Sequence, residues 1–485
     1  MSLHIFNYLT REKEPFKALE RGQVGMYVCG PTVYDHAHLG HAKLYVAMDV
    51  IARYLRFQGY KVRYVQNITD VGHILDTGED RVIKRARRER VEPMELVETY
   101  TRSYFEDMDA LNIVRPNISP RASGHIIEQI EIVTGLIEKG HAYETYEGDV
   151  YFSVASFPEY AKLSGRNVDE LEPGARVAVQ ANKRHPADFA LWKHAEAEHI
   201  LRWPSPWGWG YPGWHVECSA MAMRYLGQTF DIHGGGLENI FPHNECEIAQ
   251  SEAYTGQPFA KYFVLAGSLT VNGVKMSKSL GNFLSIKDAL KIYSPEGIRF
   301  FILSCHYRNP IDFSREAIIA AERGLERLTN TVHNLRKRIE HAMPSGTADL
   351  SYITELDPYR HAFIEAMNDD FNTPQAIAVL FDINREVNAL LASGESMGRG
   401  TLSAIDNLYR DLGGKVLGII PDDLTEKFSG DIVEGLINII LDIRKQYRES
   451  QEWDRADEIR RQLSDLNIVI DDRPEGPVWR IERGQ

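Results

Sequence analysis

The chain has 485 residues, of which 43% are hydrophobic and 26% are charged, a composition typical of two to four folded globular domains. Lys and Arg number 55 and Asp and Glu 69, so the formal net charge of −14 opposes a nucleic-acid partner unless basic residues gather locally. Four cysteines are too few and too scattered for a disulfide framework. We find no signal segment and no stretch of about 18 apolar residues, and therefore expect a cytoplasmic protein without a membrane span.

The first informative segment has the pattern of a strand, a loop and a helix. Residues 24–28 form a short apolar strand, residues 29–41 are rich in turn formers, and apolar residues then recur every three or four positions through residue 55. Residues 62–68 alternate along a second strand. Because ligands bind beyond the carboxyl ends of parallel strands, the loop 29–41 and the segment Asn67–Asp70 should line one crevice.

A second unit of the same kind follows much later in the chain. It comprises a strand over 230–233, the glycine run 234–236, a helix from about residue 244 to Gly256, and a strand over 262–265. The stretch 110–206 between the two units has the features of an insertion. We therefore predict an α/β fold whose catalytic domain is a Rossmann-type parallel sheet split by this insertion.

The C-terminal part of the chain has a different pattern. Apolar residues recur at helical spacing from residue 325 onward, which predicts a helical bundle, and a last helix with two short strands predicts a small mixed α/β module. The expected segments are the first half of the catalytic domain (1–120), the connective insertion (121–205), the second half with the candidate metal ligands (206–265), a region around a lysine-containing loop (266–320), the helical bundle (321–410) and the C-terminal module (411–485).

Two short motifs have the features of a phosphate site. His38, Gly40 and His41 stand at the start of the first helix, where free N–H groups favour an anion and a glycine permits close approach of a nucleotide. Lys275 and Lys278 lie in a loop that follows an Asn-Gly turn signal, and ammonium groups there can stabilise charge on a phosphoryl group. Taken singly, each motif is also compatible with an ordinary helix cap or a solvated basic loop.

Together, the two motifs have a known counterpart. His38-Leu-Gly-His41 and Lys275-Met-Ser-Lys-Ser279 resemble the signature motifs of class I aminoacyl-tRNA synthetases, in the expected order and on either side of the insertion. The resemblance implies that the two histidines and two lysines stabilise the charge that builds on the α-phosphate of ATP, and that Mg²⁺ accompanies ATP. It also implies catalysis by positioning and electrostatics, without a protein nucleophile.

A possible metal site is spread over three segments. Cys29 ends the first strand, Cys218 lies before the second unit, and His243 and Glu247 are four residues apart and hence on one face of a predicted helix. Two thiols, an imidazole and a carboxylate suit zinc. On spacing alone the signal is weak, because buried cysteines are usually packing residues.

The sequence around these residues resembles one family within the class. Cys29-Gly-Pro-Thr-Val-Tyr-Asp35, Gly213-Trp-His-Val-Glu-Cys-Ser-Ala-Met221 and Phe241-Pro-His243 look like cysteinyl-tRNA synthetases, and the resemblance spans nearly the whole chain. It implies that Cys29, Cys218, His243 and Glu247 bind one zinc ion per chain. Zinc binds a thiolate well and a hydroxyl poorly, so such a site would select cysteine over serine.

The resemblance also assigns further contacts and partners. It implies that Thr69, Trp214 and His215 lie near the bound cysteine, and that Gly40, His233, Gly234 and Lys278 lie near the nucleotide. A core aromatic remains an alternative for Trp214, and an interior histidine for His215. The implied partners are L-cysteine, ATP and tRNA(Cys), and the implied assembly is a monomer.

Local basic and aromatic residues offer contacts for tRNA. The run 81–90 is strongly basic and arginines recur along 323–338, although each segment is also compatible with a solvated helix face. In the C-terminal module, the segments around Trp453 and Trp479 resemble the anticodon-recognition end of the family. An exposed Trp there could stack on an unpaired base, while Trp479 is equally compatible with the core.

The chain departs from the family pattern at a few positions. Asn244 and Cys246 stand where the family usually has His and Asn, and residues 71–74 replace a common acidic pair. Glu238 and Tyr211 also differ from the usual residues. At helical spacing Cys246 should point about 100° away from its neighbour Glu247, which favours a packing role over a change of ligand. Cys305 matches no ligand position and is expected to be buried.

Three alternatives remain open from the sequence. A ligase of mycothiol synthesis activates cysteine in the same way, but it resembles only the catalytic part. A non-catalytic tRNA-binding relative would not need intact signature residues. Zinc could also be purely structural, in which case activity would survive its mild removal.

Overall fold

The structure is a computed structural model that describes residues 2–73, 80–166, 183–276, 281–344, 350–393, 397–422, 430–466, 468–473 and 476–481. The chain divides into two compact units, Met1–Asp422 and Asp423–Gln485. Lys278 of the predicted phosphate site lies outside the described residues. In the part of the chain that the structure describes, no helix combines the length and the apolar character needed to cross a membrane.

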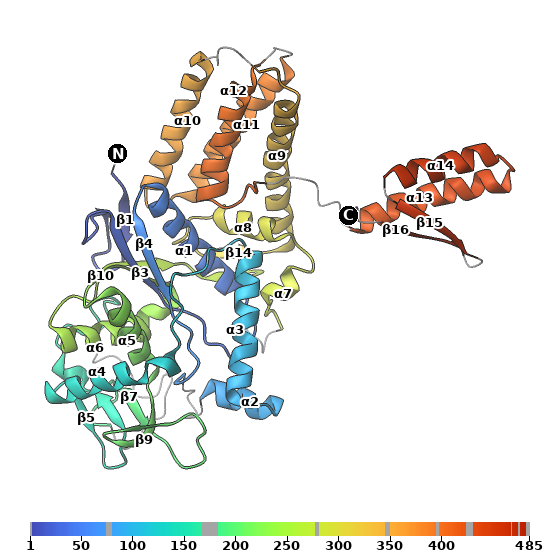
Figure 1. The fold of residues 1–485 in the computed structure, drawn as a ribbon. Helices are drawn as coiled ribbons and strands as arrows, with labels where there is room; N and C mark the ends of the chain where they lie inside the picture. Colours follow the sequence, from blue (N-terminus) through green and yellow to red (C-terminus); the bar gives the residue numbers. More distant parts are fainter. Residues whose placement is uncertain are drawn as a thin grey trace. The chain divides into compact units, whose positions relative to one another are not determined.

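A parallel sheet of four strands forms the centre of the first unit (Figure 1). Its order is β11 (Ala260–Ala266), β10 (Phe230–Gly236), β3 (Gln23–Val28) and β4 (Lys61–Gln66). The predicted strands are confirmed, and β10 continues through the glycine run. Because β3 and β10 pair in the middle of the sheet, they join the two halves of the split domain, and Cys29 N donates to Gly234 O at 3.1 Å.

Three helices pack around the ends of these strands. Helix α1 (Leu39–Phe57) follows β3 and packs against β4, β10 and α8 (Pro295–Leu303). Helix α5 (Trp214–Leu226) packs on β3 and on α6 (Glu245–Thr255), which follows β10. The loops at the carboxyl ends of β3 and β10 therefore open toward the starts of α1 and α6.

Between β4 and α5 the chain forms helices and an antiparallel sheet. Helices α2 (Arg81–Glu89) and α3 (Pro93–Ala110) precede the predicted insertion, and α4 (Ile126–Glu138) leads to strands in the order β5 (Ala142–Glu144), β6 (Val150–Phe152), β7 (Phe189–His194), β9 (Gly208–Pro212) and β8 (Trp203–Ser205). Strand β9 pairs with β7, so this sheet continues past residue 205. Its core includes Trp192 and also Cys246 of α6, which ties the insertion to the catalytic domain.

A hairpin carries the first lysine of the predicted loop. Strands β12 (Leu269–Val271) and β13 (Val274–Lys275) pair antiparallel, and β14 (Ile311–Phe313) extends β12 in parallel. Asn272 and Gly273 adopt φ values of 51° and 74°, so the predicted tight turn is confirmed. The short helix α7 (Ile286–Ala289) follows the loop.

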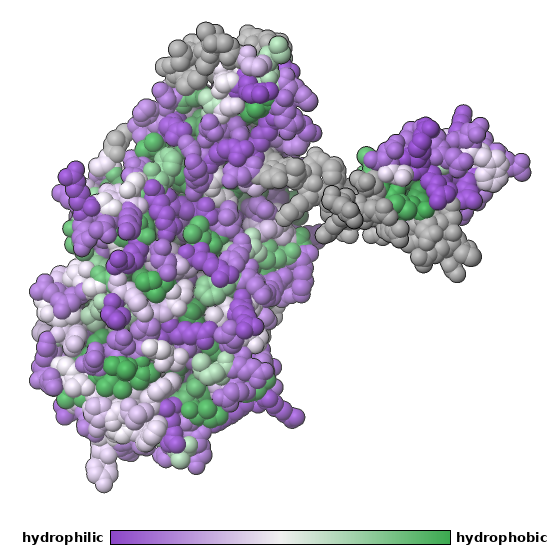
Figure 2. Space-filling view, viewed as in Figure 1, coloured by the Kyte–Doolittle hydropathy of each residue, from purple (hydrophilic) through white to green (hydrophobic). Residues whose placement is uncertain are grey.

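Four helices complete the first unit as a bundle (Figure 1). They are α9 (Arg315–Glu340), α10 (Leu350–Asn368), α11 (Thr373–Ala392) and α12 (Arg399–Tyr409), followed by a π-helical segment, Arg410–Val416. Hydrophilic side chains cover most of the visible face of the bundle in Figure 2. At the other end of the chain, β1 (His4–Asn7) and β2 (Glu12–Pro15) form a hairpin beside the bundle helix α10, since Asp370 N donates to His4 O at 3.0 Å just after that helix.

The second unit is a small mixed α/β module, as predicted. Helices α13 (Gly430–Glu449) and α14 (Trp453–Asp465) precede the antiparallel pair β15 (Ile468–Arg473) and β16 (Gly476–Ile481). Its core consists of Ile437, Leu441, Leu463 and Ile470, and Trp479 packs against this core.

A buried ion pair joins the catalytic domain to the bundle. Arg299 on α8 is fully buried, and its guanidinium donates to Asp49 Oδ2 on α1 at 2.5 Å. It also donates to the carbonyl oxygens of Leu111, Asn112 and Leu417, the last of which directly follows the π-helical segment. Arg53 also donates to Asp49 Oδ2, at 2.8 Å, so removal of Arg299 leaves the buried Asp49 with one cation instead of two.

We predict that Arg299→Met lowers the free energy of unfolding of the first unit by about 3 kcal/mol, because Asp49 loses its fully buried cation and keeps only Arg53. Equilibrium urea unfolding followed by tryptophan fluorescence measures this loss as a lower midpoint. Arg385→Met is the matched control, since Arg385 pairs with Asp382 at the surface and its side chain is 72% exposed. Equal midpoints for the two variants would contradict the assigned role of Arg299.

Candidate active site and metal centre

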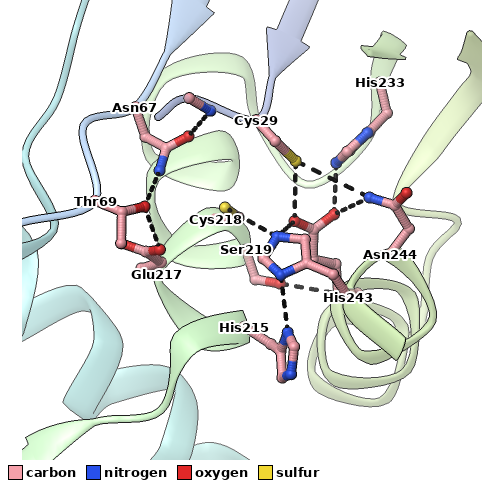
Figure 3. A network of polar contacts seen from close by, with 12 residues as sticks. Cys29, Asn67, Thr69, His215, Glu217, Cys218, Ser219, His233, His243 and Asn244 are labelled. Carbon is pink, nitrogen blue, oxygen red and sulfur yellow. Dashed lines mark hydrogen bonds and ion pairs between the residues drawn. The ribbon is translucent and has the colours of Figure 1, made fainter. Parts of the chain in front are cut away.

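Four candidate ligands converge beyond the carboxyl ends of β3 and β10. Figure 3 labels three of them, Cys29, Cys218 and His243. Cys29 follows β3, Cys218 lies on α5, His243 lies just before α6, and Glu247 lies in its first turn. Two Sγ atoms, one imidazole nitrogen and one carboxylate oxygen of this set lie within 4.8 Å of one another. All four residues are buried, and the most accessible, Cys29, is 5% exposed.

The donor types and their spacing fit a zinc ion. Cys29 Sγ lies 3.5 Å from Glu247 Oε1, and Cys218 Sγ lies 3.6 Å from His243 Nε2. Ligand atoms about 2.0–2.3 Å from a tetrahedral zinc ion stand roughly 3.3–3.8 Å apart. Hydrogen bonding with Cys218 holds the pKa of the Cys29 thiol well below its ordinary value, whereas burial raises the pKa of Cys218. A divalent cation would supply the positive charge that these buried groups need.

Two side chains hold the outer oxygen of Glu247. His233 Nε2 lies 2.5 Å from Glu247 Oε2, and the Asn244 amide donates to the same oxygen at 3.2 Å. Family resemblance implied that His233 lies near the nucleotide; in the structure its ring is fully buried and lies against Glu247. The departure at Asn244 therefore supplies an amide donor that orients a candidate ligand.

His215 orients the ring of His243. Their Nδ1 atoms lie 2.9 Å apart, while His243 directs Nε2 toward Cys218 and Glu247. One of the two Nδ1 atoms therefore donates a hydrogen to the other, which fixes both rings. Trp214 is only partly buried and stacks on His73 with ring centroids 4.0 Å apart. Its indole also lies 4.6 Å from the His243 ring, so it covers the edge of the cluster.

The other two cysteines lie outside the ligand set. Cys246 is buried in the apolar core of the insertion, and its Sγ lies 3.6 Å from the Tyr160 hydroxyl, in agreement with a packing role. Cys305 is half-buried, so the expectation of a buried residue is wrong. It stands just beyond the end of α8, next to the exposed Ser304.

The structure adds two side chains that the sequence did not single out (Figure 3). Asn67 Nδ2 donates to Thr69 Oγ1 at 3.0 Å, and the Thr69 hydroxyl donates to Glu217 Oε1 at 2.6 Å. Glu217 directly precedes Cys218 and is 1% exposed. In the sequence, Glu217 stands among the mostly apolar and small residues 216–222, which the structure shows to be buried. Because an acidic residue is seldom fully buried, this placement could have indicated a functional role for Glu217.

The start of α1 presents two neutral imidazoles. His38 Nδ1 accepts from Gly40 N at 3.1 Å, and His41 Nδ1 accepts from His38 N at 3.2 Å. The hydrogen of each neutral ring is therefore on Nε2, which makes both rings donors. Burial lowers the pKa of His38 to about 4 and the pKa of His41 well below its ordinary value. A Cβ on Gly40 would lie 2.9 Å from the His38 ring, so this position requires glycine.

The lysine loop is anchored against the same helix start. Lys275 is exposed at the end of β13. Met276 Cε, next in the chain, would lie 3.3 Å from a Cβ placed on Gly40. Beyond the loop, Leu39 N donates to Leu284 O at 3.2 Å. The described residues on both sides of Lys278 thus lie beside the two histidines.

The remaining departures from the family pattern have defined contacts. The carboxylate of Asp80 accepts from Gly72 N and from Val82 N, each at 2.7 Å. Asp80 therefore brings an acidic side chain next to residues 71–73, and it also caps the start of α2. Tyr211 is buried and stacks on His199 with ring centroids 4.3 Å apart. Glu238 is exposed.

Some of the predicted basic residues are engaged within the chain. Arg336 on α9 forms an ion pair with Asp406 on α12 at 2.7 Å, so it joins two helices of the bundle. Arg85 on α2 pairs with Glu89 at 2.5 Å. Trp453, at the start of α14, is 54% exposed, and the Arg448 guanidinium lies 6.0 Å from its ring centroid. Among the residues of the C-terminal module that the structure describes, Trp453 is therefore an exposed aromatic, whereas Trp479 packs on the core.

Three family sequence models match the chain in succession. The model for the class I (C) tRNA synthetase catalytic domain matches residues 15–323, and a DALR domain matches residues 362–421. The anticodon-binding domain of cysteinyl-tRNA ligase matches residues 434–480. The catalytic match covers both halves of the split sheet and the insertion between them.

Solved structures of other synthetases share the fold. Mycobacterium tuberculosis methionyl-tRNA synthetase in complex with methionyl-adenylate is 16% identical, with a TM-score of 0.59 over 82% of this chain and 92% of that one. The leucyl-tRNA synthetase LeuRS of Agrobacterium radiobacter, in a ternary complex with tRNA, is 13% identical, with a TM-score of 0.57 over 83% and 85% of the two chains. These likenesses agree with the split parallel-sheet fold.

Full-length relatives carry one name. The cysteine–tRNA ligase of Chlorobaculum tepidum is 52% identical over 99% of both chains, and that of a Thermus thermophilus strain is 48% identical over 100% of both. With the three family matches, these identities show that the chain belongs to the cysteine–tRNA ligase family of class I tRNA synthetases.

Proposed function

We propose that the chain attaches L-cysteine to tRNA(Cys) and that a zinc ion, held by Cys29, Cys218, His243 and Glu247, selects the substrate thiol. As a member of its family, the chain is an ATP-dependent ligase of cysteine and tRNA. The observation that carries the zinc proposal is the convergence of four buried ligand atoms within 4.8 Å. When bound, zinc stabilises a thiolate, which neither the hydroxyl of serine nor the methyl of alanine can match.

The chain's own residues keep this pocket selective. His215 and the pair His233–Asn244 hold the rings and carboxylate of the ligand set in one orientation. Trp214 covers one edge of the set and keeps water from it. Selection by a fixed thiol site is stronger than selection by an apolar pocket, so a separate editing site is unnecessary.

In the first step, we propose, a carboxylate oxygen of cysteine attacks the α-phosphorus of ATP, and the bond to pyrophosphate breaks. The Nε2–H groups of His38 and His41 donate to the phosphate oxygens, and Lys275 and Lys278 neutralise the charge that develops on them. Gly40 lets the nucleotide approach the start of α1. Mg²⁺ enters with ATP as part of the substrate complex.

In the second step, the 2′-hydroxyl of the terminal adenosine of tRNA attacks the carbonyl carbon of the adenylate. The ester bond forms, AMP leaves, and the hydroxyl proton is released. The match of residues 434–480 to an anticodon-binding domain supports tRNA as acceptor, and it disfavours a mycothiol-type ligase.

The proposal includes the domain roles expected from the sequence. Residues 1–120 and 206–265 form the catalytic domain, 121–205 the connective insertion, 266–320 the signature loop and stem-contact region, 321–410 the bundle and 411–485 the anticodon-binding module. Gly234 packs under α1 near the nucleotide, where a Cβ would lie 2.8 Å from Met48 Sδ. The proposal also includes a monomeric chain and a cytoplasmic location, since tRNA charging serves protein synthesis.

We predict that Cys218→Ala lowers the zinc content to well below one ion per chain and abolishes cysteine-dependent ATP–pyrophosphate exchange, because one of four ligands is lost. Elemental analysis and the exchange assay measure the two effects. Cys246→Ala is the matched control, since Cys246 is equally buried but lies in the apolar core, and it should retain zinc and exchange. Serine accepted as readily as cysteine by the unaltered chain would refute zinc selection.

We predict that His38 stays neutral through the physiological pH range. Its pKa of about 4 lies below the value of about 6.5 for an exposed histidine, so the folded chain takes up this proton only near pH 4. The unfolded chain takes it up near pH 6.5, and His38 therefore destabilises the fold as pH falls from about 6.5 to about 4. Hydrogen–deuterium exchange at the imidazole carbon, measured by mass spectrometry, gives the midpoint. A midpoint near 6.5 in the folded chain would contradict the neutral-donor mechanism.

We predict that Trp453→Ala raises the KM for tRNA in aminoacylation by roughly 5- to 100-fold, since base stacking on an aromatic ring contributes about 1–3 kcal/mol. Exchange of pyrophosphate, which does not require tRNA, should be unchanged. Trp209→Ala is a matched control, because Trp209 is 50% exposed and lies on β9 of the antiparallel sheet, outside residues 411–485. The same increase in both variants would argue against a specific role of Trp453.

A further inference from the structure

The segment between the lysine loop and α7 is paired with the start of α1. His38 and Ser285 form an isolated antiparallel bridge, and Ile286 N donates to Ala37 O at 2.9 Å. A side chain adds to this pairing, because the ring of Phe283 stands edge-on to the ring of His38 with centroids 5.3 Å apart. The direction of a candidate phosphate donor, the His38 imidazole, therefore depends on where this segment lies.

One lysine ties the same segment to helix α3, which lies beside α7 (Figure 1). Lys287 Nζ, on α7, lies 2.9 Å from Glu106 Oε2 and 3.4 Å from Asp107 Oδ1. The side chain of Glu106 is 67% exposed, whereas that of Asp107 is 2% exposed. An exposed ion pair contributes little, but a buried carboxylate depends strongly on its cation. Since Ser285 is the N-cap residue of α7, the contact with Asp107 also fixes the bridge.

Asp107 depends on Lys287 because it has few other partners. Its Oδ2 atom is buried and accepts no hydrogen bond from the residues that the structure describes. Among the same residues, no other lysine or arginine forms an ion pair with Asp107. Burial raises the pKa of Asp107, and the ammonium group of Lys287 opposes that rise. Loss of Lys287 would therefore leave this carboxylate out of water without a paired cation.

Helix α3 is a firm support for the contact. The hydroxyl of Tyr104 donates to Gln66 Oε1 at 2.8 Å, and both side chains are buried. The ring of Tyr104 also packs edge-on against Tyr45 of α1, with centroids 5.5 Å apart. Ser103 Oγ lies 2.7 Å from Nδ1 of His36, in the loop that leads into α1. One helix thus contacts β4, α1 and the loop before α1, and it carries their position over to α7.

We propose that Lys287 and Asp107 are positioning residues for the formation of the adenylate. Their contact holds α7 on α3, and with it the segment whose Phe283 braces the ring of His38. The inference rests on the proposed function, because it takes the Nε2–H group of His38 as a donor to the phosphate of ATP. A neutral donor stabilises developing charge only when it is already aimed at it, so the two residues act through the direction of that ring.

Matched variants separate this contact from its surroundings. Lys287→Met and Asp107→Asn each remove the ion pair without adding bulk, and Lys287→Arg keeps a cation at the same place. Lys291→Met is the control for the lysine, since Lys291 pairs with Asp288 at the surface and its side chain is 73% exposed. Glu106→Gln is the control for the carboxylate, because it removes the exposed partner of the same lysine.

Lys287→Met and Asp107→Asn should each lower the kcat of cysteine-dependent ATP–pyrophosphate exchange by roughly 10- to 100-fold, the order of loss for a group misplaced by about 1 Å. The KM for cysteine and the zinc content should not change, because the candidate metal ligands lie elsewhere. Lys287→Arg should recover most of kcat, and both controls should stay within about fivefold of the unaltered chain. The double variant should lose no more than either single variant, since both remove one contact.

A second measurement follows the pairing itself. The amide of Ile286 donates across the bridge to Ala37. Its hydrogen–deuterium exchange, measured at residue level, should be faster in Lys287→Met than in Lys291→Met, because the bridge opens more often without the contact to α3. Equal exchange rates in the two variants would contradict the assigned role of Lys287.

Three results of the kinetic assay would overturn the inference while leaving the proposed function intact. They are an unchanged kcat in both single variants, an equal loss of kcat in Lys291→Met, or additive losses in the double variant. If Asp107→Asn fails to fold, Lys287→Met and its rescue by Lys287→Arg decide between these outcomes and the expected one. Failure of the unaltered chain to exchange pyrophosphate with cysteine would overturn the proposed function itself, and this inference with it.

Discussion

The parallel pairing of β3 with β10 is the constraint on which the candidate site depends. The two strands come from opposite sides of the insertion, and their register sets Val28 opposite Gly234. Cys29, the next residue, therefore stands within reach of Cys218 on α5 and of Glu247 on α6. At the neighbouring strand end, a Cβ on Gly30 would lie 1.5 Å from Asn67 O, so only glycine lets β3 and β4 end this close together. The ligand set exists because strand pairing brings three distant segments to one edge.

Burial limits how the candidate ligands can be arranged. A carboxylate out of water must be hydrogen-bonded or paired with a cation, and each of the two oxygens of Glu247 has such partners. Oε1 faces Cys29 and His243, while Oε2 is held by His233 and Asn244. Such an arrangement costs free energy in the fold, but it leaves little freedom for the ligands to reorganise when the substrate binds. Preorganisation of this kind favours one ligand chemistry over another more than it raises affinity for all of them.

Much of the fold and of the site could be predicted from sequence, because the relevant signals are local. Hydrophobic periodicity marked β3, α1 and β10, and an Asn-Gly pair marked the turn before Lys275. Resemblance to a family supplied the four ligands, which no spacing rule would have joined. The sequence could not show that His233 contacts Glu247 or that Thr69 donates to Glu217, 148 positions later in the chain. These facts depend on side-chain direction and on tertiary pairing, which have no local pattern.

Helix α1 links the candidate phosphate site at its start to the segment after the helical bundle. Its first turn carries the neutral imidazoles of His38 and His41, and its middle carries Asp49, which the buried Arg299 ties to Leu417. Leu417 stands shortly before Asp422, where the first unit ends and the chain continues into the C-terminal unit. Lys43, also buried on α1, donates to Asn309 O at 2.8 Å and adds a second tie to the segment after α8. Uncharged N–H donors stabilise a developing phosphate charge only if they are already aimed at it, because they cannot attract it from a distance as a cation does. Under the proposed mechanism, the buried contacts of Asp49 and Lys43 therefore serve the same chemistry as the neutral histidines, because they hold α1 in place.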